Sequence, residues 1–231
     1  MTSTAQPVAL RRIAPSREAT GQRARARVVG IVGGVGCGKS TLVDAVAELV
    51  AERRVAGSTV DVLVVDGDAV GHEVRDLPEV REQLVERFGR DILDEDGSVD
   101  RFAVAQRVFA ADDGGRADLA WLNATMHPVM REEFTRRMEA TAADLVLFDA
   151  AILLETGWDD LCHEIVFLDV DESDRLARVQ ERGWDEATWR QREASQWPLE
   201  KKSAHATLLA DGSLPPETVA ADLLTLIGLT D

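Results

Sequence analysis

The chain has 231 residues, of which 45% are hydrophobic, so one enzyme-sized domain with a sizeable core is expected. Its 42 acidic and 26 basic residues give a net charge of −16, and no apolar stretch approaches the roughly 18–20 residues that span a bilayer. The charge is uneven, because residues 1–27 hold six arginines and one acidic residue. The acidic remainder argues against nucleic acid as a partner, since phosphate backbones bind basic stripes. We therefore expect neither a nucleic-acid nor a membrane partner.

The N-terminal residues and the cysteines bear on where the protein acts. Residues 1–27 show no strand or core-helix pattern and are rich in Arg, Ala, Ser and Thr, a composition that targeting peptides share. They lack a clear apolar face, so we favour a disordered basic leader.

Cys37 and Cys162 are the only cysteines, which offers no disulfide framework and suits a reducing compartment, the cytoplasm.

Residues 30–42, GIVGGVGCGKSTL, contain a complete phosphate-binding loop, or P-loop. The apolar run Arg27–Val32 predicts a buried strand before the loop, and Leu42–Val50 predicts an amphipathic helix after it. Glycines let backbone N–H groups turn toward phosphate oxygens, lysine reaches the β- and γ-phosphates, and a serine hydroxyl can ligate the bridging Mg²⁺. A glycine-rich turn that binds nothing needs neither of these side chains. The residues expected to bind ATP here are Gly34, Val35, Gly36, Cys37, Gly38, Lys39, Ser40 and Thr41.

A second predicted strand, Thr59–Val65, ends in an acidic pair, Asp66 and Asp68. Strands that alternate with helices indicate a parallel sheet, in which ligands bind beyond the carboxyl ends of the strands. Asp68 is thus expected on the same rim as the P-loop, where it could accept the proton of a hydroxyl that attacks the γ-phosphate. The alternative is a turn former or a helix N-cap, a role that suits Asp66 in particular.

Residues 71–140 are predicted to be helical and to form a substrate-binding subdomain. Three segments have three- and four-residue apolar spacing: Val80–Phe88, Arg101–Ala110 and Ala117–Ala140. Pro128 is expected to mark a helix start or a kink, because proline cannot donate to the preceding turn. Small-molecule kinases with a P-loop place their acceptor-binding insertion between the second and third strands, as this segment would be.

The predicted sheet resumes with Asp144–Phe148 and continues with Glu164–Val170. Asp149 directly follows the first of these strands, so its carboxylate could hold the Mg²⁺ shell near the P-loop, although helix capping is the alternative. We also count Asp149 among the substrate-binding residues.

An arginine-rich stretch after the last of these strands predicts a lid at about residues 176–203. Arg178 and Arg182 are four residues apart and share one helical face, and Gly183 is expected to end that helix as a hinge. Paired arginines on a lid can clamp the ATP phosphates, and Arg182 is our candidate for stabilising transition-state charge. The alternative is a solvated face paired with nearby acidic side chains.

Taken in order, seven segments resemble the bacterial dephospho-coenzyme A kinase family: GGVGCGKST, VVDGDAVGHEV, FGRDILDEDGSVDR, LNATMHPVM, LVLFDAAILLETG, RLARVQERG and REASQ. The resemblance covers about Val28 to Leu229. It implies ATP-dependent phosphorylation of the ribose 3′-hydroxyl of dephospho-coenzyme A, the last step of coenzyme A synthesis. It also implies an α/β P-loop fold with a five-stranded parallel sheet, a helical substrate subdomain and a lid, in a monomer or small homo-oligomer.

The resemblance assigns roles to individual residues. Asp68 matches the proposed base and works with Lys39 and Arg182, while His127-Pro128 matches the motif of the substrate subdomain and Arg192 falls in the lid. Three positions depart from the family pattern: His72, where arginine is usual, Ala151 and Ala210. The first puts substrate affinity in question, and a protonated His72 would replace part of the missing charge. Another nucleoside or nucleotide kinase, or a non-catalytic nucleotide-binding regulator, remains the alternative.

Overall fold

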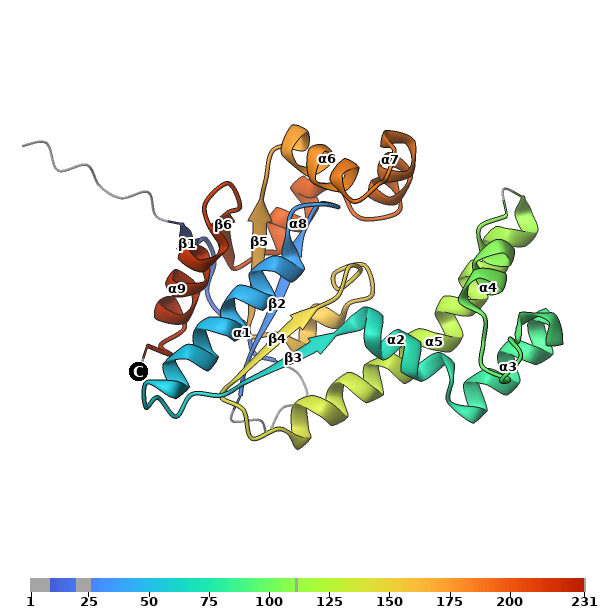
Figure 1. Cartoon of the computed structure of the whole chain (residues 1–231), viewed down its shortest axis with the longest axis horizontal. Coiled ribbons are helices and arrows are strands. Elements are labelled where there is room, and N and C mark those ends of the chain that lie inside the picture. The colour runs from blue at the N-terminus through green and yellow to red at the C-terminus, as the bar shows by residue number, and fades with distance from the viewer. Residues whose placement is uncertain (1–8, 20–25, 111, 231) are drawn as a thin grey trace, which may run out of the picture. The chain divides into compact units, whose positions relative to one another are not determined.

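The computed structural model describes residues 9–19, 26–110 and 112–230. The chain divides into two compact units (Figure 1). The first unit combines the residues up to Val65 with those from Met138 onward, and it contains the P-loop. The second unit is Asp66–Arg137. Among the described residues, no helix is both long enough and apolar enough to cross a membrane.

The first unit is built on one sheet with the strand order β1-β6-β5-β2-β4-β3. The strands are β1 Leu10–Arg12, β2 Arg27–Gly33, β3 Val62–Asp66, β4 Leu145–Asp149, β5 Glu164–Asp169 and β6 Leu208–Asp211. β2 pairs in parallel with β4 and β5, and β5 pairs in parallel with β6. The sequence places three of these strands within one residue at each end, whereas β3 begins at Val62 instead of Thr59.

The sheet has six strands instead of the expected five, because β1 adds to β6 in antiparallel orientation. Residues 9–19 of the expected disordered leader are therefore ordered. Leu10 is buried in the core, and the backbone N–H of Ile13 donates to the carbonyl of Thr207. A three-residue strand is too short to show an apolar period, so only these distant partners reveal it. The leader residues 1–8 and 20–25 lie outside the described residues.

The core of the first unit lies between the sheet and two helices, α1 (Lys39–Val55) and α9 (Pro216–Leu226). Leu42 and Val46 of α1 pack into the same buried cluster as Leu223 of α9 and Ile31 of the central strand β2. The N-terminal end of α1 is thereby fixed at the carboxyl edge of the sheet. A 3₁₀ turn at Trp158–Leu161 precedes β5, and three further helices follow that strand: α6 (Glu172–Glu181), α7 (Glu186–Ala194) and α8 (Leu199–His205).

The second unit is helical, as the sequence predicts. Its helices are α2 Gly67–Arg75, α3 Pro78–Phe88, α4 Arg101–Val108 and α5 Asp113–Ala140, with a 3₁₀ turn at Arg90–Ile92. Pro128 does not start a helix but lies inside α5. A proline inside a helix costs about 3 kcal/mol, and packing of the buried Met130 and Phe134 just after it offsets that cost.

Candidate functional site

The P-loop has the strand–turn–helix geometry that an anion site requires. β2 ends at Gly33 and the 17-residue helix α1 begins at Lys39. Gly36 and Gly38 have φ values of 86° and 96°, a left-handed conformation that other residues rarely adopt. The backbone N–H groups at the start of a helix attract anions, since the helix dipole is positive there. The loop can therefore hold a phosphate chain.

Ser40 and Asp149 meet at the edge of the sheet. The Ser40 hydroxyl donates to Oδ2 of Asp149 over 2.9 Å. Asp149 ends β4 and is in register with Ile31 of the neighbouring parallel strand, which carries the P-loop at its end. Among the described residues, no group of three or more His, Cys, Asp or Glu side chains could hold a metal ion by itself. One hydroxyl and one carboxylate suit Mg²⁺, which keeps several waters and takes its other ligands from phosphates.

A cavity of about 240 Å³ opens beside the P-loop, within the first unit. We call it the nucleotide cavity. Its lining includes Cys37, Gly38 and Thr41 from the loop and α1, Arg178 from α6, Arg182 directly after α6, and Gly212 and Leu214 after β6. Five of these were expected from the sequence. Apolar walls with two guanidinium groups suit a base joined to phosphates.

The two arginines of the nucleotide cavity have different partners. Arg178 donates to the carbonyls of Cys37, over 2.9 Å, and Gly212, over 3.1 Å, and so ties the P-loop to the turn after β6. Arg182 is exposed at the C-cap of α6, which ends at the left-handed Gly183 as the sequence predicts. Arg192 of α7 lies with its guanidinium carbon 4.3 Å from the centre of the Trp184 ring.

Of the residues expected on the acceptor side, Asp68, His72 and His127 lie in the second unit, whereas Asp149 and Arg192 lie in the first. Asp66 caps α2, because its Oδ1 accepts from the backbone N–H groups of Asp68, at 2.8 Å, and Ala69, at 3.2 Å. Asp66 is thus the N-cap residue, and the exposed Asp68 carboxylate takes no part in the cap. His72 is also exposed and lies four residues further along α2, so both side chains are on one helical face. His127 is half-buried in α5, and burial lowers its pKa.

Several residues that contact the P-loop have no signal in the sequence. Lys202 of α8 is 2% exposed, and its Nζ lies 2.6 Å from Gln196 Oε1, 3.3 Å from a Glu155 oxygen and 3.4 Å from the Gly33 carbonyl. Burial lowers the pKa of Lys202. Trp189 of α7 donates to the carbonyl of Val35 over 3.0 Å. Lys202 lies in a polar stretch of sequence and tryptophan is usually a packing residue, so neither contact is visible from residue spacing.

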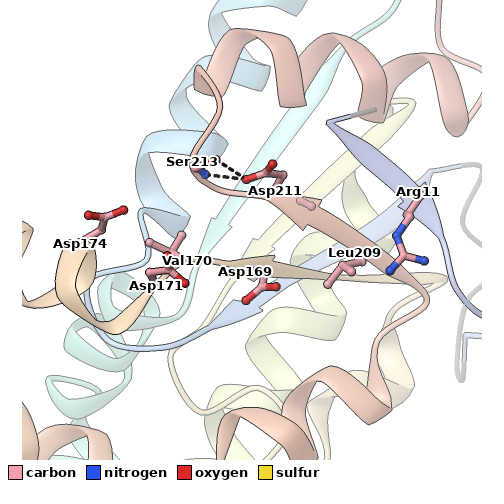
Figure 2. A pocket seen from close by; sticks show the side chains of 9 residues that line it. Arg11, Asp169, Val170, Asp171, Asp174, Leu209, Asp211 and Ser213 are labelled. Atoms are coloured by element: carbon pink, nitrogen blue, oxygen red, sulfur yellow. Dashed lines mark hydrogen bonds between the residues drawn. The ribbon is translucent and has the colours of Figure 1, made fainter. Parts of the chain in front are cut away.

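A second cavity, of about 380 Å³, lies at the carboxyl ends of β5 and β6 (Figure 2). Four aspartates line it together with Arg11 of β1: Asp169, Asp171, Asp174 and Asp211. Asp211 accepts from both the backbone N–H and the hydroxyl of Ser213 and so stabilises the turn after β6. A wall with this excess of carboxylates repels phosphates. This cavity is therefore less suited to a phosphate chain than the P-loop.

The sequence matches known proteins over most of its length. The family model described as dephospho-CoA kinase matches residues 27–214. The dephospho-CoA kinase of Corynebacterium efficiens is 33% identical over 205 residues, which cover 86% of this chain and 94% of that relative.

Solved structures agree with this match. TT1252 from Thermus thermophilus is 27% identical and superposes with a TM-score of 0.68 over 88% of this chain and 97% of its own. The dephospho-CoA kinase from Campylobacter jejuni is 16% identical, with a TM-score of 0.58 over 87% and 95% of the two chains, and so supports the fold alone. The family match begins at residue 27, so the ordered residues 9–19 lie outside it. The chain belongs to the dephospho-CoA kinase family, the transferases of the last step in coenzyme A biosynthesis.

Proposed function

We propose that the protein transfers the γ-phosphoryl group of Mg²⁺-ATP to the ribose 3′-hydroxyl of dephospho-CoA. The observation that carries the proposal is the P-loop with its Ser40–Asp149 pair, beside the nucleotide cavity, in a member of this family. The loop N–H groups and Lys39 would hold the β- and γ-phosphates. Ser40 and Asp149 would hold Mg²⁺, which neutralises charge on those phosphates when it is bound.

Asp68 is our proposed base. Its carboxylate is exposed and is spared from the helix cap by Asp66, so it is available to a substrate hydroxyl. In the transfer, the 3′-oxygen forms a bond to the γ-phosphorus, the bond from that phosphorus to the β-bridging oxygen breaks, and ADP leaves. The proton of the hydroxyl passes to Asp68. Removing this proton as the oxygen attacks makes the hydroxyl a better nucleophile.

The remaining acceptor contacts are assigned to His72, His127 and Arg192. His72 and Arg192 are exposed and can reach phosphate groups of dephospho-CoA. Burial lowers the pKa of His127, so at neutral pH this ring is uncharged and would bind by hydrogen bonds. We also propose that the enzyme acts in the cytoplasm, because Cys37 and Cys162 are both unpaired, which suits a reducing compartment.

Arg182 is proposed to stabilise charge on the transferring phosphoryl group. It lines the nucleotide cavity yet is exposed, so it can move without disturbing the core. Arg178 instead supports the walls of the cavity through two backbone carbonyls. We therefore propose Arg182, rather than Arg178, as the side chain that contacts the phosphoryl group during transfer.

A coupled ADP-release assay with a panel of acceptors tests the proposed substrate. Mg²⁺-ATP is supplied with dephospho-CoA, with adenosine or with AMP, and ³¹P NMR locates the new phosphate. We expect turnover with dephospho-CoA and a 3′-phosphate in the product. Faster turnover with adenosine or AMP would identify a different small-molecule kinase. ATP binding without turnover on any acceptor would indicate a non-catalytic nucleotide-binding regulator.

A further inference from the structure

Side chains from residues 172–205 hold three alternate carbonyls of the P-loop. The contacts are Lys202 Nζ to Gly33 O at 3.4 Å, Trp189 Nε1 to Val35 O at 3.0 Å, and Arg178 Nη1 to Cys37 O at 2.9 Å. In a planar trans peptide, the carbonyl of one residue and the N–H of the next point in opposite directions. The N–H groups of the three following glycines, Gly34, Gly36 and Gly38, therefore point away from these donors.

Both peptide groups that flank Val35 are held by side chains. Its N–H donates to Oε2 of Glu193 over 2.9 Å, so this N–H is engaged by a carboxylate. Its carbonyl accepts from Trp189 at 3.0 Å and from Nη1 of Arg175 at 3.4 Å. Nη1 of Arg175 also donates to Oε1 of Glu193 over 2.7 Å. Three side chains thus form a closed ring of contacts around one residue of the loop, which we call the Val35 clasp.

Two of the three side chains of the Val35 clasp are buried. Arg175 and Trp189 are 3% and 2% exposed, and the guanidinium carbon of Arg175 lies 5.3 Å from the centre of the Trp189 ring. Nε of Arg175 donates to the carbonyl of Val170, which anchors the clasp just beyond the end of β5. A buried guanidinium is stable only when paired, so the Glu193 carboxylate is held in place as well.

Two glycines of the P-loop make room for the clasp. A Cβ at Gly34 would lie 2.4 Å from Nη1 of Arg175, and a Cβ at Gly36 would lie 2.5 Å from the Arg175 carbonyl. A side chain at Gly34 would displace the Arg175 guanidinium, and one at Gly36 would collide with the Arg175 backbone. Glycine at these two positions therefore leaves room for Arg175 on one side of the loop, opposite the side on which phosphate would bind.

We propose that Arg175, Trp189 and Glu193 are positioning residues for ATP. By fixing both peptides of Val35, they keep the Gly36 N–H turned toward the phosphate side before ATP arrives. A loop with free peptides would have to become ordered during binding, which weakens affinity. This inference rests on the proposed binding of ATP at the P-loop, and it assigns a function in phosphate binding to one face of α7.

The test is Trp189→Phe, which keeps an aromatic ring but removes the Nε1–H donor. One hydrogen bond is worth about a threefold to tenfold change in affinity, so we expect the Kd for Mg²⁺-ATP to rise by about that factor. The KM for dephospho-CoA should stay unchanged, whereas the Tm without nucleotide should fall, because the change makes a fully buried ring smaller and removes a buried hydrogen bond. Trp197→Phe is the matched control, because that ring lies against Lys201 and His205 instead of the P-loop. It should change none of the three quantities.

Glu193 provides a second variant, which keeps the test open should Trp189→Phe fold poorly. Glu193→Gln retains an oxygen acceptor for the Val35 N–H, whereas Glu193→Leu does not, so affinity for Mg²⁺-ATP should fall in that order. An unchanged Kd in Trp189→Phe and Glu193→Leu would overturn the clasp alone. Tighter ATP binding, or equal losses for ATP and dephospho-CoA, would do the same. Wild-type protein that binds no Mg²⁺-ATP would overturn the proposed function as well.

Discussion

Arg12→Ala tests whether the N-terminal segment is part of the fold. Arg12 forms a two-pronged ion pair with Glu164, with contacts of 2.9 and 3.0 Å. The Glu164 side chain is fully buried at the start of β5. Ser16 and Thr207 each donate a hydroxyl to the same carboxylate over 2.6 Å. The substitution removes the guanidinium and leaves a buried carboxylate with too few donors.

The expected loss can be worked out from these contacts. Removing one partner of a buried ion pair costs about 3–5 kcal/mol. The Arg12 side chain is 35% exposed, Arg27 lies 3.7 Å from the same carboxylate, and both hydroxyls remain. We therefore expect a loss of about 2 kcal/mol in the free energy of unfolding at pH 7. For a chain of this size that lowers the Tm by about 4–8 °C.

The pH dependence gives this prediction a second test. Burial raises the pKa of Glu164, but hydrogen bonds from Arg12, Ser16 and Thr207 outweigh it, so the pKa lies below its ordinary value of 4.5. A lowered pKa in the folded state means that the stabilisation is complete above pH 4.5 and is lost as the pH falls through the folded-state pKa. The difference in stability between the wild type and Arg12→Ala should therefore shrink in acid.

Denaturant unfolding at pH 7 and in acid measures both effects. Arg11→Ala is the matched control, because Arg11 lies in the same strand and has no ion pair among the described residues. A loss for Arg12→Ala no larger than that for Arg11→Ala would refute the reasoning. So would a difference that grows as the pH falls.

Three further predictions concern residues of the proposed site. Asp149→Asn should raise the Mg²⁺ concentration for half-maximal activity by about 10- to 100-fold, and an unchanged Mg²⁺ titration in the ADP-release assay would contradict the metal assignment. Arg182→Ala should lower kcat more than it weakens ATP binding, because its proposed contact forms as charge develops on the phosphoryl group; equal losses in steady-state kinetics and ATP titration would mark a ground-state contact instead. His72→Arg should lower the KM for dephospho-CoA by about tenfold, whereas a KM that rises would show that His72 does not face a substrate phosphate.

Local patterns predicted those parts of the fold that depend on neighbours in the sequence. The spacing from Gly33 to Ser40 dictates the turn between β2 and α1, because only glycines adopt the observed left-handed conformation there. Asp66 caps α2 and Gly183 ends α6 for similarly local reasons. The parallel pairing of β2 with β4 then brings Ser40 and Asp149 together across 109 positions.

Contacts between distant residues without a motif were not predictable. β1 is three residues long, and its Arg12 pairs with Glu164, which lies 152 positions later in the sequence. The Val35 clasp likewise joins the P-loop to Trp189 across 154 positions. Neither contact leaves an apolar period or a spacing rule in the sequence. Of the two positions expected for Pro128, a helix start or a kink, only the start is excluded, because the residue lies inside α5.

The turnover of Asp68→Asn measures the proposed mechanism most directly. Wild type and variant are compared in the ADP-release assay with saturating dephospho-CoA, and the Kd for Mg²⁺-ATP is measured beside it. Loss of a general base should lower kcat by roughly 10²–10⁴-fold, while the Kd stays unchanged because the P-loop is intact. A variant that keeps half of the wild-type turnover would show that Asp68 is not the base.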